Sequence, residues 1–133
     1  MRILTAILFT LPVSAALAVG PATETLPSGI VIEQYREGSG NSPTITDTVR
    51  VHYQGTLASG REFDSSYSRG KPAEFPVGRV IPCWTEVLQR MKPGAAVRIA
   101  CPPQTAYGEK GIPGTIPPNS TLNFVIELLE VRR

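Results

Sequence analysis

The sequence predicts an α+β domain in which an antiparallel β-sheet packs against one short α-helix. Residues 48–57, 95–101 and 121–131 alternate apolar and polar side chains with a period of two, the pattern of half-buried antiparallel strands. A segment that begins at Pro82 has instead the three- and four-residue spacing of an amphipathic helix. Thirteen prolines and twelve glycines in 133 residues favour a loop-rich fold of this kind over a helical bundle.

The first eighteen residues predict a secretory signal peptide. Arg2 precedes an apolar run from Ile3 to Val13, and Ala16-Leu17-Ala18 follows as a cleavage site. The run is shorter than the roughly 20 residues that a membrane span requires, and no cysteine directly follows it that could carry a lipid anchor. We therefore expect an exported protein, periplasmic or secreted, without a membrane anchor. A buried N-terminal strand or an uncleaved anchor is the alternative.

Residues 19–29 predict a flexible N-terminal arm, since they contain two prolines and little apolar material. Residues 30–133 predict a single domain without internal repeats. Its first element is a short strand over Ile30–Tyr35, which ends at the loop Gly38-Ser39-Gly40.

Residues 48–57 form the clearest predicted strand, with Tyr53 on its apolar face and His52 on its polar face. Ser59-Gly60 supplies a turn in which the glycine can adopt a positive φ. We therefore expect residues 61–65 to fold back as the hairpin partner of this strand.

The predicted helix begins at Pro82 and ends at Lys92-Pro93-Gly94. Its apolar stripe consists of Trp84, Val87, Leu88 and Met91. About ten residues are too few for a helix that is stable alone, so this stripe must pack on the sheet. Between the last two strands lies a Pro- and Gly-rich loop, residues 102–120, whose length is typical of a functional segment.

Composition excludes several kinds of chemistry. A net charge of +2 gives no reason to expect nucleic-acid or anionic-membrane binding. One histidine and two cysteines cannot form a four-ligand zinc site, and no Gly-rich phosphate-binding motif is present. We expect no cofactor and no metal. His52 is expected to face solvent, which argues against a Ser/His or Cys/His nucleophilic pair.

Cys83 and Cys101 are candidates for a disulfide. Paired cysteines are usual in exported proteins, and these two begin the predicted helix and end a predicted strand on its apolar face. Two buried free thiols are the alternative. Eighteen positions separate the two cysteines, so they do not form the C-x-x-C motif of a redox enzyme.

Aromatic residues from different predicted elements converge on the apolar face of the domain. Alone, this pattern is typical of a core. Asp64, with Arg69 near enough to pair with it, and the hydroxyl of Tyr107 add polar groups, which favours a small-ligand site. The aromatic residues are Tyr53, Phe63, Phe75, Trp84, Tyr107 and Phe124.

Five segments between about Ile30 and Val131 resemble, in order and spacing, the FKBP-type peptidyl-prolyl cis/trans isomerases. The resemblance implies an antiparallel sheet of five or six strands, a half-barrel wrapped around the helix, with a proline pocket between them. The segments are Val51-His52-Tyr53-Gln54-Gly55, Gly60-x-x-Phe63-Asp64-Ser65-Ser66, Val80-Ile81-Pro82-x-Trp84, Ala106-Tyr107-Gly108 and Ile116-Pro117-Pro118-Asn119-x-Thr121-Leu122-x-Phe124.

The resemblance also implies a role for each matching residue. Trp84 would form the pocket floor, with Tyr53, Phe63, Val80, Ile81 and Phe124 as walls. Asp64, positioned by Arg69, would be the polar side chain nearest the twisting amide. The Tyr107 hydroxyl and the Ile81 backbone N–H would bind substrate carbonyls. Phe75 would lie near the rim, and Ile116 in the loop that covers one side.

The implied activity is cis/trans isomerisation of X–Pro bonds in proline-containing polypeptide clients, with macrolides as inhibitors. A proline-directed binding or chaperone module with little turnover is the alternative. We expect a monomer. Ala73, Ile112 and Cys83 depart from residues common in the family, an aromatic, a histidine and a glycine respectively, and none of the three removes a central pocket residue.

Overall fold

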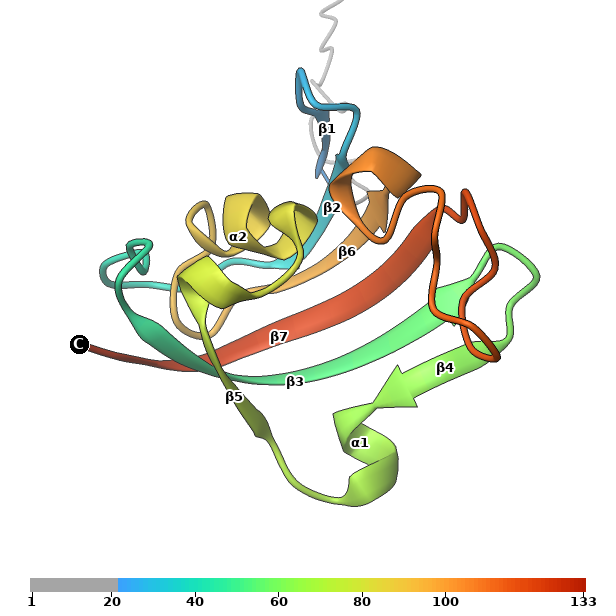
Figure 1. Cartoon of the computed structure of the whole chain (residues 1–133). Helices are drawn as coiled ribbons and strands as arrows, with labels where there is room; N and C mark the ends of the chain where they lie inside the picture. The colour runs from blue at the N-terminus through green and yellow to red at the C-terminus, as the bar shows by residue number, and fades with distance from the viewer. Residues whose placement is uncertain (1–21) are drawn as a thin grey trace, which may run out of the picture.

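The computed structural model describes residues 22–133, which form an antiparallel sheet that curves around the helix α2 (Figure 1). The predicted signal peptide, residues 1–18, lies outside the described residues. In chain order the elements are β1 (Ala22–Thr25), β2 (Val31–Arg36), β3 (Thr48–Leu57), β4 (Glu62–Ser65), α1 (Ser66–Arg69), β5 (Ala73–Pro76), a 3₁₀ turn (Val77–Arg79), α2 (Pro82–Leu88), β6 (Ala96–Cys101), a second 3₁₀ turn (Pro103–Thr105) and β7 (Leu122–Arg132).

The sheet has seven strands in the order β1-β2-β6-β7-β3-β4, and all its pairs are antiparallel. The two longest strands, β3 and β7, lie side by side across the middle (Figure 1). On its other side β3 pairs with two short strands, β5 along residues 48–51 and β4 along residues 54–56. This division leaves the second half of β3 beside the segment that carries Phe63 and Asp64.

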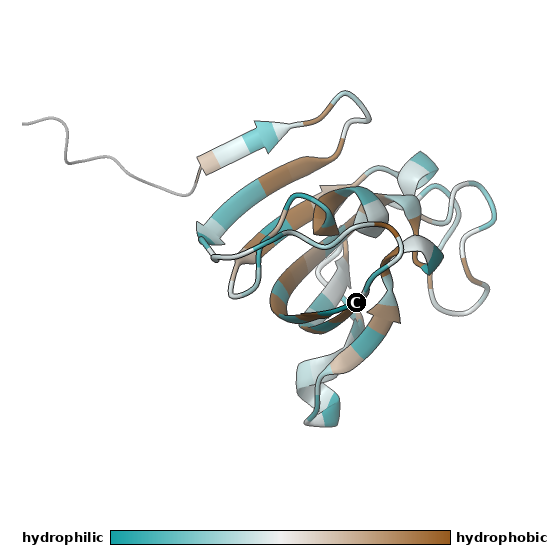
Figure 2. Ribbon diagram, turned by 90° about the vertical axis from the view of Figure 1, so that its left-hand side faces the viewer, coloured by the Kyte–Doolittle hydropathy of each residue, from teal (hydrophilic) through white to brown (hydrophobic). Residues whose placement is uncertain are grey.

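The core lies between α2 and the concave face of the sheet. The helix buries Cys83, Trp84, Val87 and Leu88 against the apolar face of the three central strands, whose hydrophobic residues are brown in Figure 2. Each large apolar side chain removed from water contributes about 1.5–3 kcal/mol, and this burial explains how a helix of seven residues persists. The buried sheet residues that it faces include Val51, Tyr53, Val97, Ile99, Ile126 and Leu128.

The three alternating strands and the hairpin are confirmed within one residue at each end. The helix begins at Pro82 as predicted but ends at Leu88, earlier than the apolar pattern indicated. After Leu88 the backbone tightens, since Arg90 N–H donates to Val87 and Met91 N–H to Leu88. Met91 is still buried, so the apolar spacing correctly identified the packed face.

The structure differs from the sequence prediction in the arm and in the number of strands. Residues 22–25 of the predicted flexible arm form β1, which pairs with β2, and a turn follows in which the Leu26 N–H donates to the Ile30 carbonyl. Leu26 is also buried, which anchors the segment. The sheet has seven strands rather than five or six, because β1 and the four-residue β5 both add to it.

Within residues 22–133, no helix combines the length and apolar character needed to cross a bilayer.

Candidate active site

A cavity of about 450 Å³ opens between α2 and the concave side of the sheet. Nine of its ten lining residues are among the predicted site residues, and the tenth, Arg79, was missed. Two predicted site residues, Arg69 and Ile116, do not line it. The lining residues are Tyr53, Phe63, Asp64, Phe75, Arg79, Val80, Ile81, Trp84, Tyr107 and Phe124.

Trp84 lies at the centre of the aromatic wall. Pro82 begins α2, and the first helical turn then directs Trp84 into the core, where it is only 4% exposed. Three rings meet it edge to face, with centroid distances of 5.1 Å to Tyr53, 5.4 Å to Phe75 and 5.3 Å to Phe124. Such T-shaped contacts favour one relative orientation, so the four rings support one another around the cavity. The Trp84 Nε1–H is buried without a hydrogen-bond acceptor among the described residues.

Gly55 makes room for the two rings on the opposite wall. It pairs with Phe124 across β3 and β7, and Phe63 and Phe124 meet edge to face at 5.7 Å beside it. A Cβ atom at Gly55 would lie 2.6 Å from Phe63 Cζ and 2.8 Å from Phe124 Cε1, which is too close for either ring to stay in place. Gly55 belongs to one of the segments that resemble the family, but the resemblance gave it no role. A glycine inside a strand is a known sign of close approach and could have indicated one.

Asp64 supplies the polar side of the cavity. The Tyr53 hydroxyl donates to Asp64 Oδ2 at 2.5 Å, and Arg69 Nη1 donates to Oδ1 at 2.6 Å. Arg69 Nη2 also donates to the Tyr53 oxygen at 3.1 Å, which closes a triangle of three side chains. Burial alone would raise the pKa of the Asp64 carboxyl, but the hydrogen bonds from Tyr53 and Arg69 outweigh it and hold that pKa below its usual value.

The short helix α1 returns Arg69 to Asp64. Ser65 caps its N-terminus by accepting a hydrogen bond from the Ser68 N–H, and Gly70 ends it at a φ of 78°. One helical turn thus places Arg69 over the carboxylate five positions earlier. The predicted pairing of Asp64 with Arg69 is confirmed by this geometry.

Of the remaining predicted site residues, Tyr107 and Ile81 line the cavity and Ile116 does not. Tyr107 is 40% exposed, and its hydroxyl has no hydrogen-bond partner among residues 22–133. The Ile81 carbonyl accepts from Trp84 and Thr85, whereas the Ile81 N–H has no acceptor within the described part of the chain. Ile116 is buried and bridges to Ile112 within its own loop, so it supports the loop from inside instead of lining the cavity.

A family model described as FKBP-type peptidyl-prolyl cis-trans isomerase matches residues 40–129. The chain belongs to the FKBP family. It is 50% identical over 113 residues to the peptidyl-prolyl cis-trans isomerase Mip of Coxiella burnetii, a match covering 85% of this chain and 49% of Mip. It is 49% identical over 109 residues to FkpA of Escherichia coli, covering 82% of this chain and 40% of FkpA.

Solved structures share the FKBP architecture. The crystal structure of E. coli FkpA superposes with a TM-score of 0.80 at 48% identity, covering 83% of this chain and 51% of that one. A peptidyl-prolyl cis-trans isomerase from Pseudomonas syringae pv. tomato gives a TM-score of 0.79 at 36% identity, covering 86% and 84% of the two chains. The chain spans half or less of the length of the curated relatives named above.

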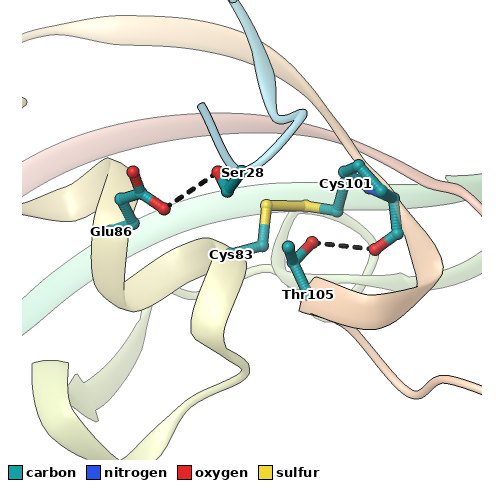
Figure 3. The surroundings of a disulfide bond; sticks show 6 residues. Ser28, Cys83, Glu86, Cys101 and Thr105 are labelled. Atoms are coloured by element: carbon teal, nitrogen blue, oxygen red, sulfur yellow. Dashed lines mark hydrogen bonds between the residues drawn. A yellow bond between two sulfur atoms is a disulfide. The ribbon is translucent and has the colours of Figure 1, made fainter. Parts of the chain in front are cut away.

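A disulfide in this FKBP domain joins Cys83 to Cys101, as predicted, with a Cα–Cα distance of 5.8 Å (Figure 3). Cys83 directly precedes Trp84, and Cys101 ends the strand from which the chain turns toward Tyr107. Nearby, the Thr105 hydroxyl donates to the Pro102 carbonyl at 2.8 Å. The disulfide therefore links the two segments that supply the centre and one rim of the cavity.

The single histidine of the FKBP domain lies on the outer face of the sheet, as predicted, but it is half-buried and not free in solvent. His52 stacks on Tyr67 with centroids 4.6 Å apart, and its Nδ1 lies 2.8 Å from Ser66 Oγ. Ser66 is fully buried, and its hydroxyl also bonds to the Tyr53 backbone. The His52–Ser66 pair is thus closed to substrates and holds α1 against β3.

Proposed function

We propose that this chain catalyses cis/trans isomerisation of X–Pro bonds in exported polypeptides. One observation carries the proposal: an aromatic cavity of about 450 Å³, large enough to hold a prolyl ring, with the ionised Asp64 on one wall. The family match supports the reaction class, and the cavity supports a site that recognises a prolyl ring by shape and apolar contact.

The reaction needs no bond to the protein. Rotation about the amide has a barrier of about 18–20 kcal/mol because the resonance of the planar form is lost. Uncatalysed, X–Pro isomerisation takes on the order of tens to hundreds of seconds. The planar amide is more charge-separated than the twisted one, so an apolar cavity disfavours the starting state relative to the transition state. A reduction of about 7 kcal/mol would accelerate the rotation roughly 10⁵-fold.

Each part of the cavity has a role in this proposal. Trp84 and the rings around it hold the prolyl ring and exclude water. Asp64 is the charged group nearest the rotating amide, and Arg69 positions it without touching the substrate. The Tyr107 hydroxyl and the Ile81 N–H, both without partners in the described residues, bind substrate carbonyls on either side.

Exchange NMR on a proline tetrapeptide, with binding measured on the same peptide, tests the activity. We expect Phe63→Ala and Asp64→Ala each to lower kcat/KM about tenfold or more. The first removes part of the apolar wall of the cavity, and the second removes its carboxylate. Ile45→Ala is the matched control, because Ile45 is exposed and outside the cavity. Wild-type turnover in both cavity variants would refute the site. Binding without isomerisation would favour the binding module.

The disulfide supports an oxidising compartment, and we propose that the chain acts in the periplasm or after secretion. Mass spectrometry of protein recovered from the cell envelope tests this step. A mature N-terminus at Val19 is expected, and an intact Met1 would contradict it. In the turnover assay, macrolides of the kind that inhibit this family are expected to compete with the peptide.

A further inference from the structure

Arg79 is a charged residue of the cavity that the proposed reaction does not use. It lines the cavity together with Phe75 and Val80, and its side chain is exposed. No carboxylate lies within 4 Å of its guanidinium among residues 22–133, and it makes no side-chain hydrogen bond there. An arginine on an apolar wall with its five donors free is a site for an anionic group.

The other charges of the cavity are already matched. Asp64 is the one carboxylate of the lining, and Arg69 pairs with it at 2.6 Å. Because Asp64 and Arg69 neutralise each other, the positive charge of Arg79 is left without a counter-charge in the lining. Apolar walls around a single charge strengthen its field at the mouth of a cleft.

The backbone below Arg79 is anchored. The 3₁₀ turn Val77–Arg79 has Val77 fully buried, and the Thr85 hydroxyl of α2 donates to the Val77 carbonyl at 2.7 Å. The Val77 N–H donates to the Asp47 carbonyl at 2.9 Å. The backbone that carries Arg79 is thus held in place beside the cavity, while the Arg79 side chain can adjust to a ligand.

We propose that Arg79 makes this site prefer clients with an acidic residue adjacent to the proline, an inference that rests on the proposed function. Neighbouring Cα atoms are about 3.8 Å apart, so with a prolyl ring in the cavity the two residues that flank the proline lie closest to it and to Arg79. A glutamate or aspartate there can form a charge-assisted, bidentate pair with the guanidinium. Because the pair is solvent-exposed, we expect a preference of about three- to fivefold in kcat/KM.

The test compares tetrapeptides that carry Glu, Gln or Lys before the proline, and a second set with these residues after it. Exchange NMR measures turnover by the full chain without a coupling protease. The proposal expects Glu over Gln over Lys in at least one set, and a smaller difference as salt is raised. Arg79→Ala should abolish the preference, Arg79→Lys should retain part of it, and Arg79→Glu should reverse it.

Arg98→Ala is the matched control. Arg98 is an exposed cation on the outer face of the sheet, and its replacement removes the same charge as Arg79→Ala. This variant should keep the Glu-to-Gln ratio. Equal turnover of Glu and Gln peptides, or an unchanged ratio in Arg79→Ala, overturns the inference while the isomerase function stands. No turnover of any peptide overturns the proposed function, and this inference with it.

Discussion

Tyr53 and Asp64, from neighbouring strands, share a hydrogen bond of 2.5 Å in which the phenol donates to the carboxylate. The same phenol forms part of the aromatic wall, where it meets Trp84 edge to face. Burial raises the pKa of the Tyr53 hydroxyl, so it remains a donor at neutral pH. The charge and the apolar surface of the cavity are therefore coupled through one side chain.

The first prediction concerns pH. Since the pKa of Asp64 lies below its usual value of about 3.9, the carboxylate stays charged between pH 5 and 8, and it adds no inflection to kcat/KM there. Arg69→Ala removes two hydrogen bonds, and the burial that remains should raise this pKa. NMR titration of the Asp64 carboxyl carbon measures both values. An inflection near pH 6 assigned to Asp64 in the unaltered chain would contradict the prediction.

The same shift has a consequence for stability. A carboxyl whose pKa is lower in the folded state stabilises that state above its unfolded pKa of about 3.9, and this contribution is lost as the pH falls through the folded value. Asp64→Asn should therefore make the free energy of unfolding depend less on pH below about pH 4. Urea unfolding at a series of acidic pH values measures this slope.

The second prediction concerns Gly55→Ala. The added methyl group would displace Phe63 and Phe124, so kcat/KM should fall about tenfold or more, with a loss of about 1–3 kcal/mol of stability. Gly60→Ala is the control, because Gly60 has a φ of 94° but no atom within 4 Å of an added Cβ. That variant should lose stability through backbone strain and keep its activity. Full activity in Gly55→Ala would show that the two rings move freely.

The third prediction concerns the disulfide. Replacing both cysteines in Cys83→Ala/Cys101→Ala should lower the free energy of unfolding by about 3 kcal/mol, as expected for a closed loop of this length. The peptide KM should also rise, since the segments bearing Trp84 and Tyr107 are then no longer tied. Urea unfolding with and without reductant checks the stability. Two titratable thiols in the denatured, non-reduced chain would show that the bridge is absent.

The fourth prediction concerns the core. Ile126→Ala should cost about 2–5 kcal/mol, because Ile126 is fully buried in the central strand β7. The same change at Ile45, which is 55% exposed, should alter stability by no more than about 0.5 kcal/mol. Thermal unfolding of the two variants under identical conditions makes the comparison. Similar losses at both positions would mean that the packing described for β7 is wrong.

Elements with long periodic patterns were predictable from sequence. The alternation around Tyr53 and around Phe124 identified two central strands and the face on which each ring lies. The four-residue β5 was not predictable, because four residues are too few to show a clear apolar–polar alternation. The strand forms only through its pairing with β3. The strand β1 could not be recognised for the same reason, because it also has four residues and forms only by pairing with β2.

The site was predictable where a residue acts through its own shape or charge. Trp84 and Asp64 fall into this class, and the resemblance placed them correctly in the cavity. Arg79 was missed because its position depends on the anchored 3₁₀ turn before α2, for which no short pattern exists. The buried location of Ile116 was also missed, since it results from a backbone bridge to Ile112 inside an irregular loop.

The place of β7 has a consequence for biosynthesis. This strand is synthesised after β3 and β6, yet it lies between them and completes both pairs. Until residues 122–132 have emerged, the nascent chain has two unsatisfied inner edges and cannot close its sheet. Closure of the sheet must therefore wait for the synthesis of β7.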